Sequence, residues 1–251
     1  MPTNKNELLE KVLRSINGNI EVKTLWNVIN VNAMDRLGMS DHGHVHFQIV
    51  ANIALKFART LHKDKVKMSL EKDYGLSYDH SEIVIFLASL LHDLGMTIDR
   101  KGHEGFSLFL ANNILREMLA FMNKEEQVII TSEVLHAIIS HRSDGKPLTV
   151  EAGIVRVADA LDMSEGRTRV SYEKGIIDIY NISATAIDKV EIKEGKDKPI
   201  SILITMNNSS GIFQVDELLK KKLKGSGIED FVSIKAVIKG DEKSLVKEFE
   251  F

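Results

Sequence analysis

Apolar residues recur every three to four positions through the first two thirds of the chain, the spacing of one face of an α-helix. The clearest stripe consists of Ile49, Val50, Ile53, Phe57 and Leu61. Comparable patterns predict helices over residues 6–17, 24–35, 45–61, 81–94, 105–121 and 124–140, with Thr149 as the N-cap of a further helix. This region is therefore predicted to be all-helical.

The pattern changes after about residue 170. Residues 189–194 and 200–206 alternate or run apolar with β-branched side chains, and they flank a turn at 195–199, which predicts a hairpin. Residues 215–224 predict a lysine-rich amphipathic helix, and residues 231–239 predict another strand. We therefore predict a mainly α protein, with an all-helical domain over residues 1–170 and a small α+β domain over residues 171–251.

Composition narrows the class of protein. The chain has 251 residues, of which 43% are hydrophobic and 27% charged, as in an ordinary globular protein. A net charge of −3 gives no strong attraction to nucleic acid or membranes, and the absence of cysteine excludes disulfides, thiolate zinc sites and cysteine nucleophiles. Because we find neither a signal peptide nor an apolar run of about 20 residues, we expect a cytoplasmic protein that does not bind membranes.

Candidate metal ligands stand out as polar interruptions of apolar segments. The pair His92-Asp93 ends an apolar helix, and burying it costs free energy unless a partner, usually a divalent metal, binds it. His46 lies near the start of the helix over 45–61, and Asp159 interrupts the apolar face of the helix after Thr149. Together, His46, His92, Asp93 and Asp159 are predicted to form a two-histidine, two-aspartate metal site.

Three segments around these residues resemble the HD superfamily of metal-dependent phosphohydrolases. Residues 46–54 resemble its first-histidine helix, residues 91–95 its central motif, and residues 157–162 its terminal aspartate helix. The chain is similar to archaeal members that carry a C-terminal α+β extension. The resemblance implies a metal-activated hydroxide that cleaves a small phosphorylated substrate, a mono- or diester of a nucleotide or related compound.

The resemblance also implies a second metal. By analogy with binuclear members, Asp93 would bridge two ions, and His103 and His141 would bind the second one. His136 is a competing candidate, although it lies about 140° around the helix from His141. Alternatively, His103 is a capping residue and His141 a helix C-terminal cation. We expect one or two ions of Mn, Fe, Co, Ni or Mg, because imidazole and carboxylate donors suit them.

Phosphoryl groups also need cations beside the metal, and Arg100, Lys101 and Arg142 are candidates, as are Arg167 and Arg169. Each is otherwise a solvated charge, and the two later arginines can instead tie the domains together. Glu104 is a candidate general acid.

Two features outside these motifs have open interpretations. His42 and His44 line the substrate mouth or belong to a surface loop. The lysines at 220–222 and 224 are most simply the solvated face of an amphipathic helix, with nucleic-acid contact as a minor alternative. A homodimer also remains open. The rival functions are a non-catalytic nucleotide-binding sensor and a diiron oxygenase on the same fold.

Overall fold

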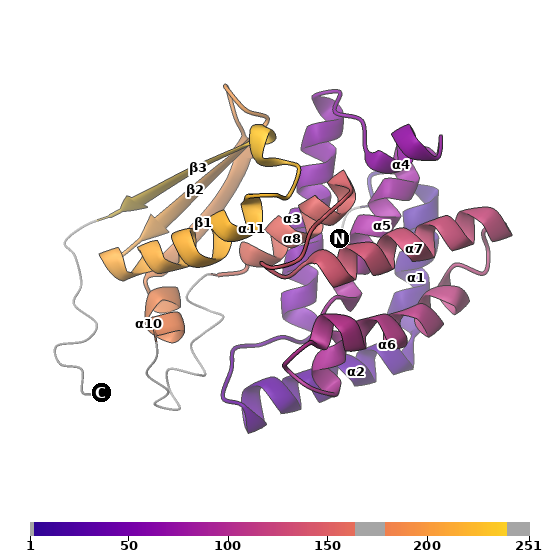
Figure 1. Cartoon of the computed structure of the whole chain (residues 1–251), viewed down its shortest axis with the longest axis horizontal. Helices are drawn as coiled ribbons and strands as arrows, with labels where there is room; N and C mark the ends of the chain where they lie inside the picture. Colours follow the sequence, from indigo (N-terminus) through magenta and orange to yellow (C-terminus); the bar gives the residue numbers. More distant parts are fainter. Residues whose placement is uncertain (1–2, 164–178, 240–251) are drawn as a thin grey trace.

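The computed structural model describes residues 3–163 and 179–239 and confirms a mainly α chain with a small sheet near its C-terminal end (Figure 1). The helices of the first region are α1 (Glu7–Gly18), α2 (Ile20–Asn30), α3 (His44–Lys63), α4 (Ser69–Asp73), α5 (Tyr78–Leu91), α6 (His103–Met118), α7 (Lys124–Ser140) and α8 (Val150–Ala160). A π-helical segment, η1 (Val31–Arg36), extends α2, and a short 3₁₀ helix, η2 (Leu94–Thr97), follows α5.

The C-terminal region contains α10 (Ile179–Thr185) and three strands, β1 (Ile187–Glu194), β2 (Ile200–Met206) and β3 (Val232–Ile238). The predicted hairpin is confirmed, since β1 pairs antiparallel with β2. β3 pairs parallel with the central strand β2, and a parallel pair needs a crossover connection. The crossover consists of η3 (Ser209–Gly211), the π-helical η4 (Gln214–Lys220), α11 (Lys221–Leu223) and η5 (Glu229–Phe231).

Helix α5 lies at the centre of the helical region, and its residues from Ser81 to Leu91 are all buried. It packs against α1, α3, α7 and α8, which explains why it is hydrophobic around its whole circumference. The predicted helix over 81–94 is three residues too long at its C-terminal end. The helix ends at Leu91, and the imidazole Nδ1 of His92 bonds to the carbonyl of Ser89 within the last turn. His92 and Asp93 therefore lie at the buried end of a central helix.

The two regions share one hydrophobic core. Ile202 and Ile204 of β2, Leu219 of η4 and Val155 of α8 belong to the same buried cluster. The C-terminal region packs beside α3 and α8, where α3 contacts β2 and α8 contacts η4 and α11 (Figure 1). The domain boundary expected near residue 170 lies outside the described residues. Within the described ranges, no helix is both long and apolar enough to cross a membrane.

Candidate metal centre

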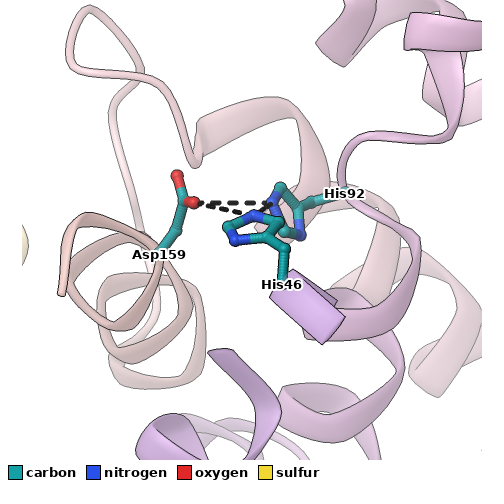
Figure 2. A group of neighbouring side chains, drawn as sticks. All are labelled: His46, His92 and Asp159. Atoms are coloured by element: carbon teal, nitrogen blue, oxygen red, sulfur yellow. Dashed lines mark hydrogen bonds and ion pairs between the residues drawn. The ribbon is translucent and has the colours of Figure 1, made fainter. Parts of the chain in front are cut away.

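Three side chains converge where α3, α5 and α8 meet (Figure 2). His46 lies in the first turn of α3, His92 directly follows α5, and Asp159 lies in the last turn of α8. The Oδ1 atom of Asp159 lies 3.3 Å from Nε2 of His46 and 3.6 Å from Nε2 of His92. The two Nε2 atoms are 3.3 Å apart, and both imidazoles are buried.

Asp93 joins this first group to a second one. Its Oδ2 atom faces the first group, 3.6 Å from Nε2 of His92 and 3.9 Å from Nε2 of His46. Its Oδ1 atom lies 2.9 Å from Nε2 of His103 and 3.5 Å from Nε2 of His141. The latter two Nε2 atoms are also 3.3 Å apart. One buried carboxylate therefore faces a pair of imidazoles on each side.

The segment after Asp93 explains how the second group forms. The N–H of Gly95 donates to Ser107 Oγ on α6, and that hydroxyl donates to the carbonyl of His92. A Cβ atom at Gly95 would lie 2.0 Å from the carbonyl oxygen of His103, so only glycine permits this close approach of η2 to α6. The glycine that follows the His-Asp pair thus brings the first residue of α6 beside Asp93.

The other ring nitrogen, Nδ1, of all four histidines is held by an oxygen. His46 Nδ1 lies 2.7 Å from the carboxylate of Asp162. The other three bond to the carbonyl three residues earlier, His92 to Ser89 at 3.0 Å, His103 to Arg100 at 2.9 Å and His141 to Ile138 at 2.7 Å. Because these bonds place the ring proton on Nδ1, the lone pairs of the four Nε2 atoms face the two groups.

The charge states of Asp93, Asp159 and His141 suit metal ligands. Burial alone would raise the pKa of Asp93, but His92, His103 and His141 hold it well below its usual range. The pKa of Asp159 is also well below its usual range, because nearby positive charge and hydrogen bonds outweigh burial. Burial lowers the pKa of His141 to about 4. The carboxylates are thus ionised and His141 is neutral at pH 7, the forms that bind a metal. Burial lowers the pKa of His92, but Asp93 and Asp159 outweigh burial and raise it above its usual value, so a metal ion would displace a proton there.

The donor set fits divalent ions. Paired Nε2 lone pairs are both acceptors and cannot bond to one another, so a cation between them satisfies both. The ligand atoms of His46, His92 and Asp159 lie within 4.8 Å of one another, and so do those of His92, Asp93 and His141. Either group could hold a metal ion, and the two groups share His92. The contacts of Asp93 with His103 and His141 extend the second group toward α6.

The cluster forms part of the lining of a cavity of about 580 Å³. Asp93, His103, His141 and Asp159 contribute from the helical region. The opposite wall belongs to the C-terminal region and consists of Ala184, Gln214, Glu217, Leu218, Lys221 and Lys222. A ligand that filled this cavity would contact both regions at once.

The sequence profile of the HD domain family matches residues 44–164, the segment that holds all six clustered side chains. An archaeal relative, uncharacterized protein MJ1020 of Methanocaldococcus jannaschii, is 42% identical over 92% of this chain and 89% of its own length. The chain belongs to the HD domain family.

More distant relatives of this HD domain protein are ribonucleases Y. The one from Acholeplasma laidlawii is 26% identical over 72% of this chain, and the one from Alkaliphilus metalliredigens is 30% identical over 55% of it. These matches span only 35% and 28% of the two ribonucleases. No solved structure gives a significant match.

Of the described cations expected beside the metal ligands, two line the cavity and one does not. Arg100 and Arg142 line the cavity, and a terminal nitrogen of Arg100 lies 3.0 Å from His103 Nδ1. Lys101 is exposed and lies outside the cavity lining. Glu104 is also outside it, with its Oε2 atom on the Nδ1 side of His103, 3.5 Å away. Glu104 follows His103 by one helical position, and its general-acid role stays a prediction.

Of the other histidines considered, His42 lines the cavity, whereas His44 and His136 do not. His136 is half-buried on α7 and lies apart from the cluster, because its Nε2 accepts a hydrogen bond from the N–H of Leu148 at 2.9 Å. His42 lines the cavity and its ring packs 5.6 Å from that of His46, whereas His44 is exposed. Arg167 and Arg169 lie outside the described residues.

Sequence reasoning missed Asp162 as the partner of His46, although Asp162 stands in the quoted motif. It also missed Lys222. This lysine was expected on a solvated face, but its side chain is only 14% exposed and pairs with Oδ2 of Asp159. The expectation was wrong because α11 packs against α8, which turns one lysine of the run inward. The one available signal was a buried Asp159 without a basic partner on its own helix.

Proposed function

We propose that this HD domain protein is a metal-dependent phosphohydrolase that cleaves a nucleotide or a related phosphate ester. The observation that carries the proposal is the shared carboxylate of Asp93, which lies between two pairs of imidazoles at the wall of a cavity. Arg100 and Arg142 line the same cavity, and phosphoryl oxygens are the partners that guanidinium groups favour.

The proposed roles follow from the position of each side chain. His46, His92 and Asp159 would hold one ion, His103 and His141 a second, and Asp93 would contribute one oxygen to each. Divalent Mn, Fe, Co, Ni or Mg would supply Lewis acidity and lower the pKa of a bound water, so that a nucleophile is available near neutral pH.

The protein itself would orient the substrate. Arg100 and Arg142 would hold phosphoryl oxygens and stabilise the charge that develops on them. Asp162 would fix the ring of His46, so that its Nε2 atom stays aimed at the ion. The similarity to ribonucleases Y supports cleavage of a phosphate ester. Because the chain spans only about a third of their length, we infer this type of reaction from them and not their substrate.

The first test is metal content followed by hydrolysis. The purified protein is analysed for bound metals and assayed with p-nitrophenyl phosphate, bis-p-nitrophenyl phosphate and a panel of nucleotides. His46→Gln should lose metal and activity together. His44→Gln is the matched control, because this exposed histidine lies two residues away on the same helix. If both variants behave alike, the site is not the one described.

The rival functions give different results in the same experiment. Uptake of oxygen by an iron-loaded sample, with no phosphate release, would contradict the hydrolase proposal and support an oxygenase. Tight nucleotide binding without turnover across Mn²⁺, Co²⁺, Ni²⁺ and Mg²⁺ would replace it by a sensor.

A further inference from the structure

Three cations of the cavity each stand beside a different member of the metal cluster. Arg100 contacts His103, Arg142 follows His141 directly in the chain, and Lys222 pairs with Asp159. Two of them come from loops of the helical region and one from α11 of the C-terminal region. Arg100 and Arg142 line the same cavity as Lys222.

The position of Lys222 is set by tight packing of α11 against α8. A Cβ atom at Gly153 would lie 1.9 Å from the carbonyl oxygen of Ser226, so the segment after α11 rests directly on α8. Arg156, one turn further along α8, donates to the carbonyl of Lys221 at 3.2 Å. It also donates to the carbonyls of Ser143 and Gly145, in the loop that carries Arg142. Arg156 therefore fixes two of the three cations relative to each other.

Lys222 differs from its neighbours in the same helical segment. Lys220 and Lys221 are more than half exposed and pair with Asp216 and Glu217, one turn earlier. Lys222 instead reaches across the cavity to Oδ2 of Asp159, whose Oδ1 faces the histidines. A lysine ammonium carries three donors, so this pairing leaves donors for a ligand in the cavity.

The charge of the cavity favours a strongly anionic ligand. Among the described residues, its lining holds four carboxylates and four lysine or arginine side chains. Their charges balance, so each divalent ion bound at the cluster makes the cavity more positive. A terminal phosphate group carries nearly two negative charges at pH 7, whereas an internal phosphodiester carries one.

We propose that Lys222, together with Arg100 and Arg142, binds the terminal phosphate of a phosphomonoester, so that the C-terminal region selects monoesters over diesters. The inference rests on the proposed function and narrows its substrate class. It distinguishes this chain from the ribonucleases Y, since the internal bond of an RNA chain is a diester.

Calorimetry on the metal-loaded protein tests the binding claim without turnover. Inorganic phosphate is the dianionic probe and dimethyl phosphate the monoanionic one. The unmodified protein should bind phosphate at least about tenfold more tightly, and Lys222→Met should weaken phosphate binding by about tenfold or more, as expected for loss of a charge-assisted hydrogen bond. Dimethyl phosphate binding should change less.

Lys220→Met is the matched control, because it removes the same charge from the same helical segment outside the cavity, and phosphate affinity should stay within about twofold of the unmodified value. Lys222→Gln keeps a donor for Asp159 and tests the charge alone, which covers the case that Lys222→Met does not fold. Equal phosphate affinity in Lys222→Gln and Lys220→Met would overturn the proposal, as would a preference for dimethyl phosphate.

Hydrolysis separates this inference from the function on which it rests. If p-nitrophenyl phosphate is cleaved faster than bis-p-nitrophenyl phosphate and Lys222→Gln removes that preference, the hydrolase function and the role of Lys222 are both supported. If both esters are cleaved equally and the variant changes nothing, the function stands and the role of Lys222 falls. If neither is cleaved while phosphate binding still depends on Lys222, the binding site stands and the hydrolase falls.

Discussion

The two walls of the cavity are built differently. The wall from the helical region carries buried imidazoles and carboxylates, and each histidine ring is fixed by a bond at its second nitrogen. The wall from the C-terminal region carries lysines on a half-exposed helical segment, and only Lys222 reaches the cluster. On our proposal, the buried imidazoles and carboxylates of the first wall bind metal, whereas Lys222 of the second wall acts with Arg100 and Arg142 on the ligand. Substitutions of the metal ligands and of Lys222 should therefore affect metal binding and ligand binding separately.

The largest expected effect is that of Asp93→Ala, because this carboxylate faces both groups of ligands. Its removal should abolish metal binding at both positions and lower kcat/KM by on the order of a thousandfold or more. Metal analysis and a single-substrate assay measure the two effects. Asp99→Ala, in the exposed loop after η2, is the control. If Asp93→Ala still bound two ions per chain, Asp93 would not be a ligand of both metal positions.

A smaller effect is expected for Asp162→Asn. The substitution keeps an acceptor for His46 Nδ1 but removes its negative charge, so metal affinity should fall by about 10- to 100-fold. Titration of the metal-free protein with Mn²⁺ measures it. Asp216→Asn, which changes an exposed carboxylate of the opposite wall, should leave metal affinity unchanged. Equal affinities in the two variants would contradict the orienting role of Asp162.

Gly153→Ala tests the contact between the walls. Its Cβ atom would collide with the Ser226 carbonyl, so we expect a loss of about 1–3 kcal/mol in the free energy of unfolding and weaker phosphate binding at normal metal content. Gly105→Ala is the control, because a Cβ there meets nothing within 4 Å and alanine favours a helix by up to about 1 kcal/mol. Urea denaturation compares them, and a stabilised Gly153→Ala protein would refute the close packing.

The smallest effect is expected for His136→Gln. Because the side chain faces Leu148 rather than the cluster, metal affinity should stay within about twofold of the unmodified protein. His141→Gln, five residues later, should lose the second ion. Mn²⁺ titration of both variants checks the assignment, and a loss of metal from His136→Gln would place a seventh side chain in the cluster.

Much of the fold and of the candidate site follows from local patterns. The apolar periodicity predicted the long helices, and the alternation with a turn at 195–199 predicted the hairpin. Helix ends were less accurate, as at α5, because the apolar pattern continues through Leu94 into the 3₁₀ helix η2, where the chain has already left the α-helix. The short α4 and α10 were not predicted, since helices of five and seven residues have too few turns to show a period.

The sequence by itself determined which side chains are costly to bury without a metal. His46 and Asp159 lie among apolar helical positions and His92-Asp93 end an apolar helix, so their burial requires a partner that binds imidazole and carboxylate groups. It also determined the family, because three motifs occur in order. Only the tertiary structure decided that His136 faces away, that Glu104 lies behind His103, and that Lys222 meets Asp159 from 63 residues further along the chain. The contact between Lys222 and Asp159 depends on how α11 packs against α8. Residue spacing within one helix predicts which face is apolar, but it does not predict how that helix packs against another element.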